Sequence, residues 1–153
     1  MPNHVHLVVV PLDGNALQRV MKPLHMRHAQ RLNRMQGSNG IVWQGRYFSS
    51  VLDQTYLWNA IRYVELNPVR ADMVAEPAAW PWSSYRAHAG LADTPPWLDT
   101  LGLHRYLLGR EPVGHADHRT AARRYEKLVA AGLGIELWTQ ALNKHIYLGH
   151  DAL

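Results

Sequence analysis

The sequence predicts an α/β fold in which a small mixed part is followed by a helical tail. Three observations lead to this prediction. The chain opens with HVHLVVV (4–10), an apolar run with the alternation typical of a β-strand. Apolar residues recur at helical spacing in the stretches before and after residue 50. From about residue 98 onward the pattern is helical throughout, so the strands are confined to the first part.

The first strand is expected to lead into a long helix. The turn PLDGNAL (11–17) offers Asp13 or Asn15 as a helix cap. The helical pattern then continues to about Met35, with an interruption or kink expected near Pro23, because proline lacks the backbone N–H that a helix needs.

A strand pair and a second helix are predicted next. GSNG (37–40) is typical of a loop, and the β-branched and aromatic residues of IVWQGRYFSSVLD (41–53) indicate two strands around Gly45. From Gln54 the period becomes helical and gives an amphipathic helix that is expected to stop near Pro68.

The rest of the chain is predicted to be a connector followed by helices. EPAAWPWSSY (76–85) is rich in proline and tryptophan, and Ser83 or Ser84 suits the start of a short helix. Helical patterns follow in LHRYLLG (103–109), in residues 118–134 and in ELWTQALNKHIYLG (136–149).

Composition limits the kinds of protein this can be. The 153 residues suffice for one buried core, and the absence of cysteine excludes disulfides and thiolate metal sites. No apolar run is long enough to span a membrane and no secretory pattern opens the chain, so we expect a cytoplasmic protein. The net charge of +4, with a basic stretch at 18–34 that holds no acidic residue, makes nucleic acid a reasonable partner.

Two small groups of side chains suggest chemistry. His4 and His6 would share one strand face, where a bound metal ion is one way to satisfy both imidazoles; a structural role is the alternative. Asn59, Tyr63 and Asn67 lie four residues apart and share a face of the second helix. A phenol can attack a phosphodiester, and an amide oxygen is a ligand that magnesium or manganese accepts.

Four blocks in order resemble a known family. MPNHVHLVV, WQGRYFSSVLD, IRYVELNPVRADMV and WPWSSYRAH are similar to the corresponding blocks of the REP-associated tyrosine transposases, which belong to the HUH single-tyrosine transposases. The resemblance covers most of residues 1–90. It implies a catalytic domain over 1–90 and a helical C-terminal extension over 91–153. It also implies a ferredoxin-like antiparallel sheet with helices on one face.

The resemblance implies roles for particular residues. The metal ligands of the family fall on His4, His6 and Asn67, with Mg²⁺ or Mn²⁺ as the cofactor, and the catalytic residue falls on Tyr63. The implied reaction cleaves single-stranded DNA beside a hairpin through a 5′-phosphotyrosine intermediate and then rejoins it. Relatives occur as monomers and as homodimers.

Basic residues supply candidate DNA contacts. Arg62 and Arg70 flank Tyr63 on the helix, with Arg62 ~100° from it around the helix axis, and we assign both to phosphate contact rather than to activation of the phenol. Arg46 is a comparable candidate, and Arg27 and Arg31 belong to the basic stretch. The alternative for each is an ordinary surface arginine.

One departure from the family concerns the start of the chain. In relatives the histidine block follows a first strand and helix, and here it stands at Met1, so we expect the first strand and helix to be missing. Two explanations fit: the true start lies upstream of Met1, or this is a truncated copy. The apolar strand would then lose a pairing neighbour. Two other hypotheses therefore stay open beside the transposase: a DNA-hairpin-binding protein without catalysis, and a decayed transposase fragment.

Overall fold

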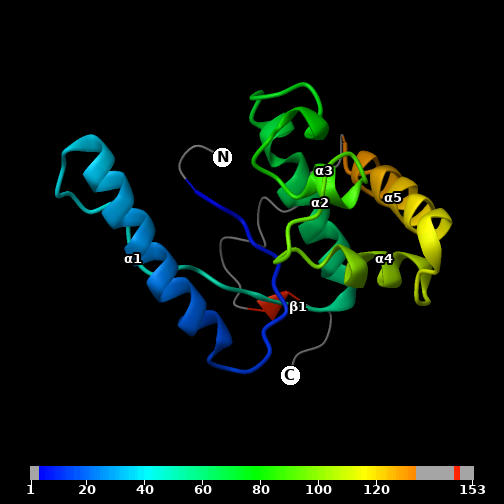
Figure 1. Ribbon diagram of the computed structural model, residues 1–153, viewed down its shortest axis with the longest axis horizontal. Coiled ribbons are helices and arrows are strands. Elements are labelled where there is room, and N and C mark those ends of the chain that lie inside the picture. The colour runs from blue at the N-terminus through cyan, green and yellow to red at the C-terminus, as the bar shows by residue number, and fades with distance from the viewer. Residues whose placement is uncertain (1–3, 134–146, 149–153) are drawn as a thin grey trace. The chain divides into compact units, whose positions relative to one another are not determined.

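The computed structural model describes residues 4–133 and 147–148 of the chain (Figure 1). Most of these residues are helical, and their contacts divide the chain into two units. One unit spans Val8–Ser50, and the other joins residues 4–7 to the chain from Val51 onward. No helix among the described residues is long and apolar enough to cross a membrane.

The unit Val8–Ser50 is built on helix α1 (Ala16–Gln36). Asn15 stands at its N-cap, as predicted, and the helix continues through Pro23 without interruption. Its end is set by Gly37, whose φ of 62° lets the backbone N–H turn back to the carbonyl of Asn33. The predicted long helix is confirmed, and the predicted interruption is wrong.

The segment after α1 folds back on the helix rather than forming strands. The side-chain amide of Asn33 donates to the carbonyl of Gly40 at 2.8 Å, and the Trp43 indole N–H donates to the carbonyl of His25 at 2.9 Å. Residues 43–46 form a bend, so the strand pair predicted around Gly45 is wrong. These two hydrogen bonds hold the loop against α1. A strand pair would instead need backbone hydrogen bonds between its own two strands.

The second unit is centred on helix α2 (Gln54–Arg70). The carboxylate of Asp53 caps it by accepting the Tyr56 backbone N–H at 2.9 Å. The helix runs two residues past Pro68, where we expected it to stop. A proline in the last turn costs only one helical hydrogen bond, and the carbonyl of Pro68 accepts the Met73 N–H at 3.0 Å beyond the helix end.

The connector is followed by short elements, as predicted. A 3₁₀ turn η1 (Pro77–Ala79) leads to helix α3 (Tyr85–His88). The Ser83 hydroxyl accepts the Tyr85 N–H at 3.2 Å, so this serine supports the start of the helix. The Ser84 hydroxyl instead donates to Glu65.

Two predicted helices complete the described part. They are α4 (Thr100–Leu108) and α5 (Gly114–Ala130). The third predicted stretch, residues 136–149, lies outside the described residues except for Tyr147–Leu148, which form strand β2 rather than helix. Strand β2 pairs in parallel with β1 (Val51–Leu52), with Val51 opposite Tyr147.

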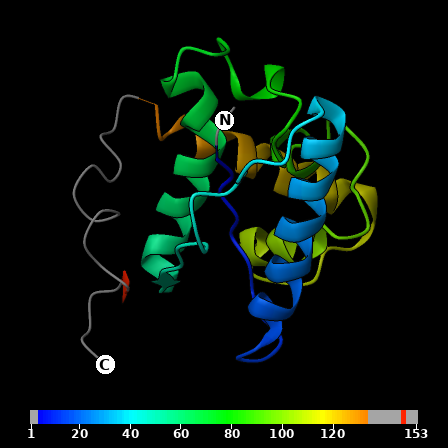
Figure 2. The same ribbon diagram turned by 90° about the vertical axis from the view of Figure 1, so that its left-hand side faces the viewer.

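The core of this unit lies where α2 meets α5. Leu66, Tyr125 and Val129 are buried there, with Ala89 at the end of α3. Figures 1 and 2 show the C-terminal end of α5 close to α2. The contacts thus join residues on both sides of position 90, and the domain boundary expected there stays a prediction.

The expected ferredoxin-like antiparallel sheet is not found among the described residues. Their sheet has two strands of two residues each, and they are parallel. Residues 4–10, predicted as a strand, form neither helix nor strand. Their apolar side chains are accordingly exposed, from 41% for Val8 to 92% for Val10. The observed architecture is mostly helical.

Candidate metal and nucleophile site

The two N-terminal histidines lie side by side. The ring centroids of His4 and His6 are 4.8 Å apart and the rings meet edge to face, at 82°. His4 is exposed and His6 is half-buried. The spacing of two residues predicted that the two rings would lie on the same side of the chain. Side chains at i and i+2 share a side wherever the backbone is extended.

Helix α2 brings the candidate nucleophile to the same place. The ring of Tyr63 lies 5.2 Å from the ring of His6, centroid to centroid, at an angle of 78°. The two residues are far apart in the sequence but belong to the same unit. The structure therefore gathers His4, His6 and Tyr63, as the resemblance implies.

The expected third ligand lies one helical turn beyond the tyrosine. Asn67 is half-buried on α2 and, at four residues from Tyr63, projects from the same side of the helix. One turn before Tyr63, the Asn59 side-chain oxygen accepts from Arg62 at 3.4 Å. Of these two asparagines, Asn67 is the one closer to the C-terminal end of α2.

The electrostatics of His6 favour its neutral form. Burial lowers the pKa of His6 below its ordinary value, and the positive charge of neighbouring His4 lowers it further. The Nε2 atom of His6 is buried and has no hydrogen-bond partner. A neutral imidazole with an unused nitrogen is the form that binds a metal ion.

The donor set can be compared with what a divalent ion requires. No three His, Cys, Asp or Glu side chains gather into a metal site within residues 4–133 and 147–148. The resemblance implies Asn67 as a third ligand, and an amide oxygen is a hard donor that Mg²⁺ or Mn²⁺ accepts. The donor types are compatible with such an ion, and the metal site itself stays a prediction.

Two of the predicted DNA-contacting arginines serve the packing of helix α5. The Arg62 Nε–H donates to the carbonyl of Leu128 at 2.8 Å, and Arg70 donates to the carbonyl of Gly132 at 3.0 Å. Both guanidinium groups thus meet carbonyls at the end of α5, where cations are favoured. A phosphate contact by either arginine stays a prediction.

A buried carboxyl that the sequence analysis missed holds α2 in place. Glu65 is 2% exposed, and its Oε1 accepts from the Ser84 hydroxyl at 2.6 Å and from the Tyr125 hydroxyl at 2.7 Å. Burial raises the pKa of Glu65, against the effect of these hydrogen bonds. The signal was present: with Leu57 and Ile61, Glu65 continues a spacing of four along the apolar stripe.

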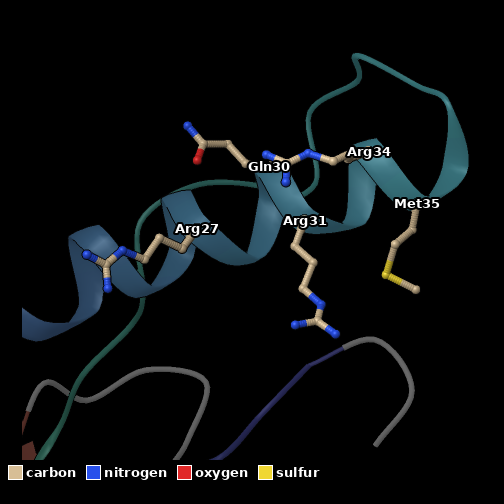
Figure 3. Close-up of a pocket in the computed structure, with 5 residues that line it drawn as sticks. All are labelled: Arg27, Gln30, Arg31, Arg34 and Met35. Carbon is tan, nitrogen blue, oxygen red and sulfur yellow. The ribbon is translucent and has the colours of Figure 1, made fainter.

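The remaining predicted DNA contacts belong to the unit Val8–Ser50. Arg27, Arg31 and Arg46 are exposed. The first two line a shallow hollow of about 480 Å³ on α1, together with Gln30, Arg34 and Met35 (Figure 3). Arg34 was not among the predicted contacts, although the same basic stretch contains it.

The comparison with family models gives one match. Residues 1–67 match the model described as "Transposase IS200 like". Searches of curated proteins and of solved structures give no significant match. The matched stretch includes His4, His6 and Tyr63 and ends at Asn67. This part of the chain is therefore similar to a transposase family, a class of proteins that bind DNA and move it.

Proposed function

We propose that this protein nicks single-stranded DNA beside hairpins and transfers the strand, through a covalent 5′-phosphotyrosine intermediate on Tyr63. The observation that supports this most is the meeting of Tyr63 with His6, whose ring lies 5.2 Å away and whose buried Nε2 has no hydrogen-bond partner. The family match over the same residues agrees with it.

The covalent step exchanges one ester for another. The phenolic oxygen of Tyr63 attacks the phosphorus, and a Tyr63–phosphate bond forms as the bond to the 3′ oxygen breaks. The phenolic proton is lost and the departing 3′ oxygen gains one, so the nick leaves a 3′ hydroxyl. A second 3′ hydroxyl then attacks the phosphotyrosine, releases Tyr63 and rejoins the DNA, with no nucleotide consumed.

Three side chains are the expected ligands of a metal ion. His4, His6 and Asn67 would hold a Mg²⁺ or Mn²⁺ ion, which supplies charge stabilisation at the phosphate oxygens when bound. His6 contributes its unused Nε2, and its depressed pKa keeps the imidazole in the neutral state at pH 7. Tyr63 and Asn67, one turn apart on a rigid helix, keep nucleophile and ligand at a fixed separation.

A covalent-adduct assay tests the proposal. The protein is mixed with Mn²⁺ and end-labelled single-stranded hairpin DNA from its own genomic flanks, denatured and run on a gel. A labelled protein band is expected, and it should be lost in Tyr63→Phe and in His6→Ala. Tyr106→Phe is the matched control, since this tyrosine is 42% exposed and its ring lies beside Trp58, 5.0 Å away between centroids. A band that persists in Tyr63→Phe would contradict the proposal.

A second candidate function is DNA binding without catalysis. It is favoured by α1, which carries exposed arginines and no acidic residue. Such a protein would bind hairpin DNA with strong salt dependence. Binding that is unchanged in Tyr63→Phe, together with no adduct from the folded wild-type protein, would select this function or a decayed transposase over the nickase.

A further inference from the structure

Helix α1 carries a row of positive charges that form no ion pair with a carboxylate in the described part of the chain. Arg27, Arg31 and Arg34 are exposed, and none of them forms an ion pair among residues 4–133 and 147–148. Arg19 on the same helix differs, because it pairs with Asp13. We call Arg27, Arg31 and Arg34 the arginine row.

The arginine row has a defined geometry. Its three residues span about 10 Å along the helix at 1.5 Å per residue and line the hollow of about 480 Å³. Figure 3 shows the three arginine side chains on this part of α1, beside Gln30 and Met35. Successive residues of an α-helix are ~100° apart around its axis, so Lys22 lies about 180° from Arg31. Lys22 is therefore outside the row.

An aromatic group lies beside the arginine row. The Trp43 ring stacks on His25 at 4.2 Å between centroids and 17° between planes, and it meets His28 at 5.3 Å. The indole N–H bond to the His25 carbonyl fixes the tryptophan on α1. His28, the exposed member, is about 60° around the helix from Arg31. We call His25, His28 and Trp43 the aromatic shelf.

We propose that the arginine row and the aromatic shelf together bind single-stranded DNA, with phosphates on the arginines and an unpaired base on His28 and Trp43. This inference rests on the proposed function, and it assigns the strand a surface in the unit Val8–Ser50. The combination is the one that single strands require: a positive track for the backbone and ring faces for bases. Within a duplex the bases stay stacked on each other, so the shelf would add nothing.

The rings of the aromatic shelf also favour single-stranded DNA over an acidic protein as the partner. An acidic protein partner would use the arginines but would gain little from the stacked imidazole and indole. A base uses both, since every base has a π face and stacks on aromatic side chains without sequence preference. The half-buried Trp43 is already ordered by its hydrogen bond, so binding does not have to order it.

Fluorescence anisotropy with labelled oligothymidylate and with a duplex of the same length tests the proposal. Chelator is present throughout, so that binding is measured without cleavage. The variants are Arg27→Ala/Arg31→Ala/Arg34→Ala together, Trp43→Ala, Trp43→Phe and His28→Ala. Lys22→Ala is the matched control, because it removes one charge from the opposite side of the same helix.

The expected results separate the two parts of the surface. The triple arginine variant should flatten the slope of log affinity against log salt by about 2, as three single-strand phosphate contacts predict. Trp43→Ala and His28→Ala should weaken oligothymidylate binding at least about fivefold and leave duplex binding nearly unchanged. Arg31→Ala alone should weaken it more than Lys22→Ala.

Two comparisons would overturn the inference. Equal losses in Arg31→Ala and Lys22→Ala would mean that only net charge matters. Trp43→Phe keeps a ring but loses the indole N–H, so it should retain most of the affinity; a loss as large as in Trp43→Ala would mean that the tryptophan only fastens the loop. Circular dichroism of each variant confirms that α1 remains, and exposed His28 provides the variant least disturbing to the fold.

The outcome is independent of the chemistry at Tyr63. If these binding differences appear but no covalent adduct forms, the strand-binding surface stands and the proposed nickase fails. If the adduct forms but the shelf variants bind oligothymidylate as wild type does, the nickase stands and this inference fails.

Discussion

The two units of the molecule place their side chains in different ways. In the unit around α2, Leu66 and Tyr125 are completely buried, and Glu65 bonds two other elements from inside the core. In the unit Val8–Ser50, helix α1 buries only Met21 and is fixed to its loop by a few polar and ring contacts. The first arrangement suits a reacting group that must not move. The second leaves charges and rings accessible to a partner.

The largest expected difference between the units is in their response to lost apolar contacts. Leu66→Ala removes a fully buried side chain beside Tyr125 and should lower the free energy of unfolding by about 3 kcal/mol. Leu24→Ala on α1 should cost less than about 0.5 kcal/mol, because that side chain is 52% exposed. Urea unfolding of both variants measures the difference, and equal losses would remove the distinction between the units.

A pH effect should come from the buried histidine of α3. Burial, and then the charge of His104, lowers the pKa of His88 from 6.5 to about 4. The unfolded chain therefore binds a proton that the folded chain does not, and stability should fall as pH falls from 6.5 towards 4, by at most about 3 kcal/mol.

The control for this pH effect is His88→Asn, whose amide group can still form a hydrogen bond with the Thr100 hydroxyl that lies 3.1 Å from Nδ1. The difference in unfolding free energy between wild type and variant, measured from pH 7 to pH 4, isolates His88 from Glu65, whose raised pKa acts in the opposite direction. A difference that does not change with pH would contradict the prediction.

A smaller effect is expected at Glu65. Glu65→Ala leaves the half-buried Ser84 hydroxyl and the buried Tyr125 hydroxyl without their acceptor and should cost about 2 kcal/mol of unfolding free energy. Glu65→Gln keeps an acceptor oxygen and should cost less. If both substitutions cost the same, the hydrogen bonds are not what holds α2 against α3 and α5.

The sequence predicted the parts of the fold that depend on neighbouring residues. Helix α1 ends at Gly37 and helix α2 begins after Asp53 because of caps within a few positions. The expected antiparallel sheet was not found, since strands require pairing partners distant in sequence, which periodicity does not specify, and residues 4–10 form no strand. The contact of Arg62 with the Leu128 carbonyl could not be predicted for the same reason.

The candidate site was predicted in part from spacing and in part from resemblance. The spacing of two residues placed the His4 and His6 rings together, and the spacing of four placed Tyr63 and Asn67 on one side of α2. That His6 meets Tyr63 depends on how residues 4–7 fold against α2, which periodicity does not specify. Only the four sequence blocks, taken together, indicated that meeting.

The most direct test of the central claim is to locate the DNA linkage on the protein. The covalent adduct formed with Mn²⁺ is digested with nuclease and trypsin and analysed by fragmentation mass spectrometry. The chain has seven tyrosines, but the tryptic peptide YVELNPVR, from Tyr63 to Arg70, contains one. We predict a nucleotide phosphate on Tyr63 in that peptide. A linkage on any other tyrosine would contradict the account.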